Sequence, residues 1–335
     1  MMVRKNIPEK IPVFMASDND YAAITDVAII SILENTKSDI DLFLITNDID
    51  YEKLEKIKHT VSKYKNAKIE FINIDIKKMF SSFKTWRHVS ITGFARLLIP
   101  WIKPNIDRAI YVDGDVVFID DIAKLYSYDI KNFPLGAAKA IEIGNTTKAK
   151  QKILQPLELD DNHTYFNSGV LLINCKKWRA DKKLPNGFFE IEQNFPNHIC
   201  ADQDILNKYF ENNYFRLPQK FNVTFCQPNV FESYEEYENT MADMVVRHFV
   251  GPSKVNNSIN NNCTAHLSSY YKWWQYAQKS DFFAEFIIKM IQKYAYNKKR
   301  HSYWLRLFGI IPFIKHKKGT LFLFGLLPII STKRE

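Results

Sequence analysis

The first 120 residues alternate between short apolar runs and longer amphipathic segments. The apolar runs have the length of buried strands and lie at residues 12–16, 41–45, 68–72 and 109–112. Between them, residues 24–32 place apolar side chains on one helical face, and residues 51–64 form a charged amphipathic segment. Strands that are separated by helices cross over before they pair, so their neighbours are parallel. We therefore expect an α/β fold.

The composition limits the class of protein and its compartment. The chain has 335 residues and a formal net charge of +9, which suits nucleotide phosphates, nucleic acid or an anionic membrane surface. Its four cysteines form neither a CxxC pair nor a cluster at zinc-ligand spacing, so we expect a reducing compartment. We expect no secretory signal, and no transmembrane helix because no apolar run reaches about 20 residues. These features predict a cytoplasmic protein.

Two aspartates follow the fourth apolar run. Asp113 and Asp115 are separated by one glycine, and in an extended chain such side chains point the same way, about 6–7 Å apart. His248 ends a later apolar run. Ligands bind beyond the carboxyl ends of strands in open α/β sheets, so we expect these three residues to meet. Two carboxylates and an imidazole predict a site for Mn²⁺ or Mg²⁺.

Other polar residues near predicted strand ends suit a nucleotide that carries a diphosphate. Asp18 and Asp20 follow the first run, Asn167 lies at the edge of another, and Gly251 and Lys254 follow His248. A glycine allows close backbone approach, and a lysine supplies a cation. Competing motifs are absent, since none of the ten glycines forms a GxGxxG, a P-loop or a GxSxG elbow.

Six blocks of sequence, in order, resemble glycosyltransferase family 8, of the type that adds galactose or glucose to bacterial lipopolysaccharide. The resemblance runs from about residue 11 to residue 254, and its blocks are residues 14–18, 87–97, 111–115, 165–174, 202–207 and 248–254. It implies a GT-A fold, which is a Rossmann-like mixed sheet flanked by helices. It also implies a UDP-sugar donor, Mn²⁺ and transfer with retention at the anomeric carbon.

The resemblance also implies a role for each matching residue. Asp113, Asp115 and His248 would hold the metal. The donor would be bound by Ala16, Asp18 and Asp20 at the nucleoside, by Gly251 and Lys254 at the diphosphate, and by Arg96, Asp113, Asn167, Asp202 and Gln203 toward the sugar. His88 would lie on the acceptor side.

The expected chemistry favours attack from the front face of the donor. The sugar centre becomes oxocarbenium-like, and Asp202 or Asp204 would stabilise it. Gln203 matches the family position on the far face, but an amide is a poor nucleophile for a double displacement. We therefore expect the acceptor to attack while the sugar and the leaving diphosphate form an ion pair. The expected catalytic residues are Gln203, Asp202 and Asp204.

The chain departs from the family pattern on the acceptor side. Ala140 falls where an acceptor-binding aspartate is expected, and Val255-Asn256 replaces the usual Pro-Trp. Asp20 stands where the galactosyltransferases commonly carry asparagine. The first two departures concern the acceptor and the lid rather than the metal and nucleotide site.

The C-terminal part differs in composition from the rest. We expect a catalytic domain at residues 1–255, a linker and helical extension at 256–297, and a helical, basic and apolar tail at 298–335. In the tail Leu307-Phe308-Gly309-Ile310-Ile311-Pro312 recurs as Leu323-Phe324-Gly325-Leu326-Leu327-Pro328, with a cluster of cations between the copies. Cations mixed with apolar residues predict a peripheral anchor on the inner face of an anionic membrane rather than a nucleic-acid surface. The alternative is a tail that packs on the domain or on a second copy.

Two other functions remain open from the sequence. One is a metal-dependent hydrolase that splits nucleotide sugars, which would need a positioned water and no acceptor pocket. The other is a non-catalytic nucleotide-sugar-binding protein. The intact charges of Asp113, Asp115, His248 and Lys254 argue against a degenerate site.

Overall fold

The structure is a computed structural model. It describes residues 10–46, 48–84, 90–143, 146–251, 254–255, 267–295, 302–307, 311–317, 320–323 and 327–331. His88, the predicted acceptor-side residue, lies outside these ranges.

A seven-stranded sheet forms the centre of the molecule, in the order β3-β2-β1-β4-β7-β6-β8. Its strands are β1 (Lys10–Ser17), β2 (Asp39–Thr46), β3 (Ala67–Asn73), β4 (Ala109–Val112), β6 (Leu135–Lys139), β7 (Phe166–Ile173) and β8 (Phe215–Arg216). The first four in the chain, β1 to β4, pair with one another in parallel, which confirms the pairing predicted from the alternating pattern. β7 runs antiparallel to both β4 and β6, so the sheet is mixed.

After β4 the chain enters a separate two-stranded sheet. It pairs β5 (Val116–Phe118) with β9 (Val246–His248) in antiparallel register, with Val116 opposite His248. The late strand predicted to end in a histidine therefore lies beside the residues that follow β4.

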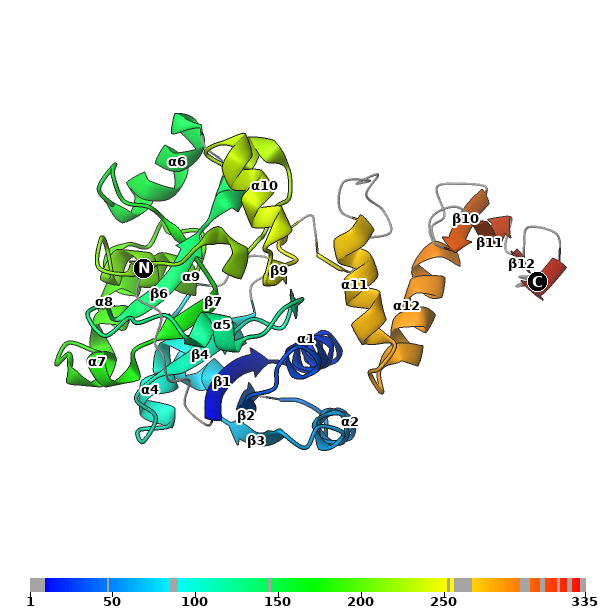
Figure 1. Ribbon diagram of the computed structural model, residues 1–335, viewed down its shortest axis with the longest axis horizontal. Coiled ribbons are helices and arrows are strands. Elements are labelled where there is room, and N and C mark those ends of the chain that lie inside the picture. The colour runs from blue at the N-terminus through cyan, green and yellow to red at the C-terminus, as the bar shows by residue number, and fades with distance from the viewer. Residues whose placement is uncertain are drawn as a thin grey trace. The chain divides into compact units, whose positions relative to one another are not determined.

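Helices cover both faces of the central sheet, as Figure 1 shows, with α1 and α2 on one side and α4, α7 and α8 on the other. The α-helices up to residue 242 are α1 (Ala22–Glu34), α2 (Tyr51–Ser62), α3 (Ile76–Met79), α4 (Ile99–Ile102), α5 (Ala123–Tyr126), α6 (Thr147–Leu154), α7 (Cys175–Ala180), α8 (Asn186–Asn194), α9 (Asp202–Tyr209) and α10 (Tyr234–Ala242). Short 3₁₀ helices are η1 (Ile91–Leu98), η2 (Ile141–Ile143), η3 (Gln155–Leu157), η4 (Gln219–Phe221) and η5 (Pro228–Val230).

An aromatic cluster fixes the 3₁₀ helix η1 against the sheet. Phe80 is fully buried and stacks on Phe94 at 5.4 Å and on Phe189 at 5.5 Å, while Phe83 meets it edge-on at 4.8 Å. Phe94 lies two residues before Arg96 on η1. The cluster therefore sets the position from which Arg96 reaches the carboxyl ends of the strands.

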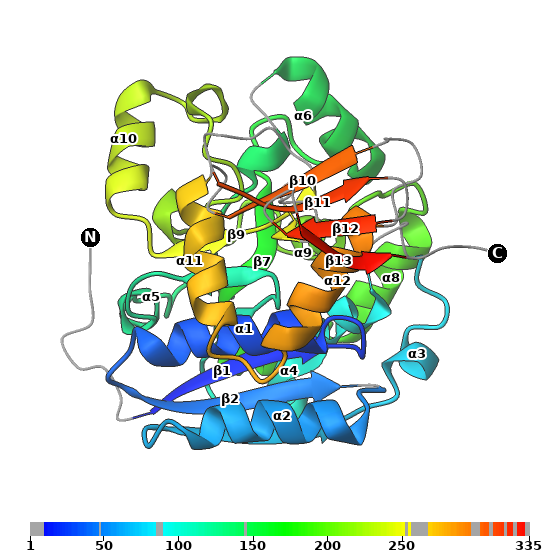
Figure 2. The same cartoon turned by 90° about the vertical axis from the view of Figure 1, so that its right-hand side faces the viewer.

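The helix α11 (Leu267–Ala277) belongs to the same compact unit, which extends to Ser280. It lies beside α1 in both views (Figures 1 and 2), and Asn35 donates a hydrogen bond of 2.7 Å to the hydroxyl of Tyr276. Ser280 donates to the buried carboxylate of Asp26 at 2.6 Å. The first helix after the predicted boundary at residue 255 thus packs on the domain that precedes it.

A second unit begins at Asp281 and contains α12 (Phe283–Ala295). It also holds an antiparallel sheet of β10 (Ser302–Leu307), β11 (Ile311–Lys317), β12 (Thr320–Leu323) and β13 (Leu327–Ser331), the orange to red strands in Figure 2. The prediction of a helical tail is therefore wrong for the described residues of the tail, although the described part of the extension before it is mostly helical. Glycine and proline in each repeat disfavour a helix, while the aromatic and branched residues around them favour strands.

The internal repeat of the tail corresponds to a repeated pairing pattern. Leu307 pairs with Ile311 between β10 and β11, and Leu323 pairs with Leu327 between β12 and β13. Both ladders carry a register shift at the same place, after Leu305 in the first and after Leu321 in the second. Each copy of the repeat thus includes the last residue of one strand and the first residues of the strand that pairs with it. Within the described residues, no helix is both long and apolar enough to cross a membrane.

The first prediction concerns the aromatic cluster. Replacing Phe80 with Ala should lower the free energy of unfolding by about 3–5 kcal/mol, because it leaves a cavity among packed rings. Tyr51, whose side chain is 76% exposed, serves as the control, and Tyr51→Ala should change the same quantity by about 0.5 kcal/mol or less. Urea unfolding followed by circular dichroism measures both. Equal losses in the two variants would contradict the packing described for Phe80.

Candidate active site

A cavity of about 380 Å³ opens where β1 and β4 end, a size typical of small-molecule sites. β7 contributes its first residues to the same edge because it runs in the opposite direction. The lining includes eleven residues predicted from the sequence, namely Ala16, Asp18, Arg96, Asp113, Asp115, Asn167, Asp202, Gln203, His248, Gly251 and Lys254. The structure thus brings together residues that are up to 238 positions apart (Ala16 to Lys254).

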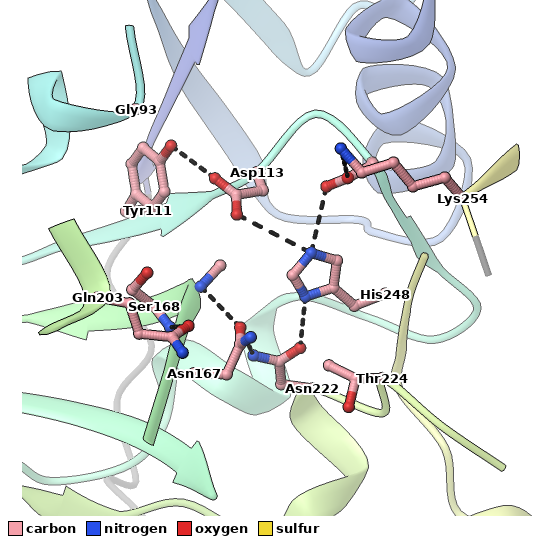
Figure 3. Close-up of polar contacts among 12 residues, drawn as sticks. Gly93, Tyr111, Asp113, Asn167, Ser168, Gln203, Asn222, Thr224, His248 and Lys254 are labelled. Atoms are coloured by element: carbon pink, nitrogen blue, oxygen red, sulfur yellow. Dashed lines mark hydrogen bonds and ion pairs between the residues drawn. The ribbon is translucent and has the colours of Figure 1, made fainter. Parts of the chain in front are cut away.

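Asp113, Asp115 and His248 converge at one side of the cavity. Figure 3 shows Asp113 directed toward the ring of His248. Nε2 of His248 lies 3.2 Å from Oδ1 of Asp115 and 3.9 Å from Oδ2 of Asp113. The strand register causes this arrangement, because the amide of Phe249 donates to the carbonyl of Asp115 at 2.9 Å. One ligand atom from each of the three residues lies within 4.8 Å of the other two.

The segment that carries the two aspartates is a turn, so the expectation of an extended tripeptide is wrong. Gly114 and Asp115 form the turn between β4 and β5. A Cβ at residue 114 would come within 2.4 Å of the Thr25 hydroxyl on α1, so only glycine fits there. The carboxylates meet because the chain folds back at Gly114, rather than because alternate residues of a strand share a face.

The donor set fits a hard divalent cation. Oδ1 of Asp113 accepts hydrogen bonds from Arg96 and from Tyr111, each at 2.8 Å, which leaves Oδ2 directed toward His248. Burial raises the pKa of Asp115, but the hydrogen bond and charge of His248 lower it more, so the carboxyl stays ionised. Two carboxylate oxygens and an imidazole nitrogen suit Mn²⁺ or Mg²⁺ and leave coordination positions for phosphate oxygens.

Arg96 is buried between two carboxylates. Its guanidinium pairs with Asp113 at 2.8 Å and with Asp202 at 3.0 Å, and it donates to the carbonyl of Ser168 at 2.6 Å. Burial lowers the pKa of Arg96, but the charges of Asp113 and Asp202 raise it more, so the guanidinium stays protonated. Its plane also lies over the ring of Tyr111, at 4.3 Å from the ring centre. Arg96 therefore connects the cluster at His248 with the part of the cavity lined by α9.

Asp202 and Gln203 form that part of the cavity at the start of α9. Burial raises the pKa of Asp202 to about 6, with a contribution from the charge of Asp113 and against the charge of Arg96. Ser168 donates its hydroxyl proton to Asp202 at 3.0 Å and its backbone amide proton to Oε1 of Gln203 at 3.0 Å. Both side chains are therefore held by one residue of β7.

Asp204, the third predicted catalytic residue, does not line the cavity. Its carboxylate is buried and accepts hydrogen bonds from the hydroxyl of Tyr165 and from the backbone amides of Ile199 and Cys200. It stabilises the loop before α9 instead.

At the other end of the cavity, Lys254 lies near Asp115 and Tyr21. Its ammonium group is 3.9 Å from Oδ2 of Asp115 and 2.5 Å from the hydroxyl of Tyr21. Burial lowers the pKa of Lys254, but the charge of Asp115, the hydrogen bond with Tyr21 and the charge of Asp113 together raise it more, so the net shift is upward. Asp18 begins α1 by accepting from the amides of Asp20 and Tyr21. The side chain of Asp20 is exposed and lies outside the cavity lining.

Sequence reasoning missed several polar residues near the site, and Tyr21, Glu142 and Asn222 are examples. Glu142 lines the cavity and accepts from Asn167 at 2.7 Å and from Thr224 at 2.9 Å. Asn222 lies behind His248, with its Oδ1 at 2.9 Å from Nδ1. Glu142 and Asn222 are in or next to one-turn 3₁₀ helices, which have no periodic signal in the sequence.

Comparison with known proteins identifies the family. A model of glycosyl transferase family 8 matches residues 12–258, which is most of the chain. This chain belongs to that family. The match contains the β4–β5 turn, α9 and His248, so the family assignment covers every residue that lines the cavity.

Individual family members and structures agree with this assignment. The lipopolysaccharide 1,2-glucosyltransferase of Escherichia coli is 28% identical over 248 residues, which cover 71% of this chain and 70% of that relative. The glycosyltransferase GlyF of Streptococcus pneumoniae serotype 4 is 28% identical over 218 residues, or 63% of this chain, which spans about half (48%) of GlyF. The galactosyltransferase LgtC, solved with donor and acceptor sugar analogues, superposes with a TM-score of 0.69 at 25% identity and covers 81% of this chain and 96% of its own. The mixed sheet with flanking helices is thus like that of LgtC, which confirms the expected GT-A fold.

The second prediction tests how β7 makes room for His248. A Cβ at Gly169 would lie 2.2 Å from Cε1 of His248 and 2.7 Å from Oδ2 of Asp113, so Gly169→Ala should displace the imidazole. We expect Mn²⁺ binding, measured by electron paramagnetic resonance with UDP present, to weaken by about 10-fold or more.

The matched control is Gly136→Ala on the neighbouring strand β6. There the added Cβ would meet side-chain carbons at 3.4 Å, an ordinary contact, so Mn²⁺ binding should not change. Undiminished binding in Gly169→Ala would contradict the packing of His248 against β7.

Proposed function

We propose that this family 8 glycosyltransferase moves a hexose, glucose or galactose, from a UDP-sugar to a glycan acceptor with retention at the anomeric carbon, assisted by Mn²⁺ or Mg²⁺. The observation that carries the proposal is the convergence of Asp113, Asp115 and His248 on one side of a cavity that Lys254 also lines. A cation site next to the ammonium group of Lys254 suits a diphosphate better than a single phosphate or a neutral ligand.

The donor would lie along the cavity from β1 to α9. Ala16 and Asp18 line its β1 end, where the uracil would bind, and Gly251 and Lys254 line the part next to the metal cluster. The hexose would then reach Arg96, Asn167, Asp202 and Gln203, whose polar groups suit sugar hydroxyls. Asp20 is exposed and lies outside the lining of the cavity, and it would contact the nucleoside from there.

The chain's own residues would stabilise the leaving group. Cleavage of the sugar–phosphate bond leaves negative charge on the diphosphate, and Lys254 would move from Asp115 to donate to it. A bound divalent cation adds Lewis-acid stabilisation of the same charge. Only stabilisation that grows in the transition state contributes to the rate, and charge on the leaving oxygen grows there.

Asp202 is the carboxylate best placed to face the sugar centre. It lines the cavity, whereas Asp204 does not. We therefore propose Asp202, rather than Asp204, as the residue that stabilises the oxocarbenium-like sugar. Gln203 presents an amide held by Ser168, which binds hydroxyls but is a poor nucleophile. We therefore propose front-face attack by the acceptor within an ion pair, and a covalent sugar adduct trapped on the unmodified chain would contradict it.

The acceptor is proposed from the relatives. The Escherichia coli relative is named for lipopolysaccharide, so lipopolysaccharide or another cell-surface glycan is the proposed acceptor class here. His88 would contact it. The basic and apolar tail would hold the enzyme on the inner face of an anionic membrane, where a lipid-linked acceptor is available.

A panel of UDP-sugars with Mn²⁺ and a lipid-linked glycan acceptor, scored by UDP release and by product mass, tests the proposal. We expect one UDP-hexose to be consumed and its sugar to appear on the acceptor. Release of free sugar that acceptor does not suppress would instead indicate a nucleotide-sugar hydrolase. The absence of turnover with every UDP-sugar, together with tight binding, would indicate a binding protein.

The third prediction concerns the metal cluster. Asp115→Asn removes a charged ligand, so metal-dependent turnover should fall by about 100-fold or more while the fold survives. Asp243→Asn is the matched control, because Asp243 pairs with Lys220 on the surface at the end of α10. UDP release and far-UV circular dichroism measure the two effects, and undiminished turnover in Asp115→Asn would refute the metal assignment.

The fourth prediction concerns the tail. A chain that ends at Asn297 lacks the four-stranded sheet and its cations, so it should lose most binding to vesicles containing anionic lipid. Hydrolysis of the donor in the absence of acceptor should stay within about twofold, because the described residues that line the cavity end at Lys254. Vesicle sedimentation measures the first quantity, with neutral vesicles as the control. Unchanged sedimentation with anionic vesicles would show that the tail is not the anchor.

A further inference from the structure

Two buried asparagines lie behind His248, on the side away from the carboxylates (Figure 3). Asn222 follows η4, and its Oδ1 lies 2.9 Å from Nδ1 of His248. Its Nδ2 donates to Oδ1 of Asn167 at 2.8 Å. Asn167 lines the cavity, whereas Asn222 is fully buried and does not. Asn222 is therefore placed to act on the site only through its neighbours.

The orientation of the Asn167 amide is fixed by groups whose hydrogen-bonding roles are unambiguous. The backbone amide of Gly169 can only donate, and it lies 2.8 Å from Oδ1 of Asn167. The carboxylate of Glu142 can only accept, and it lies 2.7 Å from Nδ2. The atom of Asn167 that faces Asn222 is therefore an oxygen.

This oxygen sets the orientation of Asn222, and Asn222 in turn sets the ring of His248. Because Asn167 presents an acceptor, Asn222 must direct its NH₂ group toward it and its carbonyl oxygen toward His248. A carbonyl oxygen only accepts, so Nδ1 of His248 carries the proton of that hydrogen bond. Nε2, on the opposite edge of the ring, then points at Asp115 and Asp113.

We propose that Asn222 is a positioning residue for the cation, which holds His248 with Nδ1 protonated and Nε2 directed at the metal position. A histidine ligand needs its other nitrogen oriented by a hydrogen bond, and such partners contribute about 10–100-fold to metal affinity. The proposal rests on the metal dependence proposed above. It also links Asn167, on the wall assigned to the donor sugar, to a metal ligand through one amide.

The backbone around Asn222 does not depend on its side chain, so substitutions there can be tested in a folded protein. The amide of Asn222 donates to the carbonyl of Gln219 at 3.0 Å, and the Gln219 side chain donates to the carbonyl of Asn222 at 2.7 Å. Asn222→Leu keeps the size of the side chain but cannot accept from Nδ1. Asn222→Asp still accepts from Nδ1 but loses the donor to Asn167.

The first experiment is a titration of the full chain with Mn²⁺ in the presence of UDP, followed by electron paramagnetic resonance. We expect Asn222→Leu to weaken Mn²⁺ binding by about 10–100-fold and Asn222→Asp to restore it to within about 10-fold of wild type. Asn174→Leu is the matched control, because this asparagine follows the opposite end of β7 and its side chain bridges backbone groups there. It should lower thermal stability yet leave Mn²⁺ affinity unchanged.

The second experiment detects the nitrogen ligand directly. Pulsed electron paramagnetic resonance of the Mn²⁺ complex should show hyperfine coupling to an imidazole nitrogen in wild type, weak coupling in Asn222→Leu and none in His248→Ala. Equal affinity and coupling in wild type and Asn222→Leu would refute the role of Asn222 while leaving the proposed function intact. A wild-type chain that binds no Mn²⁺ would refute the proposed metal dependence and, with it, this inference.

Discussion

The antiparallel pairing of β7 with β4 is the constraint on which the site depends. Because β7 runs against its neighbours, its first residues reach the edge at which the parallel strands end, and the amide of Asp113 continues the ladder by donating to Gly169 at 2.8 Å. Gly169 has no side chain, so the ring of His248 occupies the space above it. One reversed strand thus brings Asn167 and Ser168 next to carboxylates that leave β4.

Charge balance explains how several carboxylates can share one cavity. Arg96 is buried with Asp113 and Asp202 as its partners, and Lys254 lies near Asp115. Removing one member of a buried pair leaves an uncompensated charge, which costs about 3–5 kcal/mol. The aromatic packing of Phe80 and Phe94 that holds η1 therefore supports the electrostatics of the site as well as the core.

The sequence predicted those features that follow from strand periodicity. The apolar runs predicted the parallel strands. The polar residues that follow apolar runs predicted the site, and they include Asp113, Asp115, His248 and Lys254. It did not predict the turn at Gly114. The need for glycine there comes from the closeness of Thr25 on α1, and the sequence does not show that these two residues are neighbours. The choice between Asp202 and Asp204 could have been made from the sequence. Residues two apart on a helix lie about 200° apart around its axis, so the two carboxylates cannot face one cavity. Asn222 was out of reach, because its role depends on distant residues that fix an amide orientation.

The ammonium group of Lys254 has a consequence for the protein without its metal. It lies 3.9 Å from Asp115 and is held there by the Tyr21 hydroxyl, so a positive charge already stands beside the carboxylates. Many small metal-binding domains require their ion in order to fold, because the free energy of metal binding contributes to folding. Here the lysine acts as an internal counter-ion, so we expect the protein to fold without a bound divalent cation. In the proposed reaction, the same side chain would become available to the diphosphate when a cation neutralises Asp115 in its place.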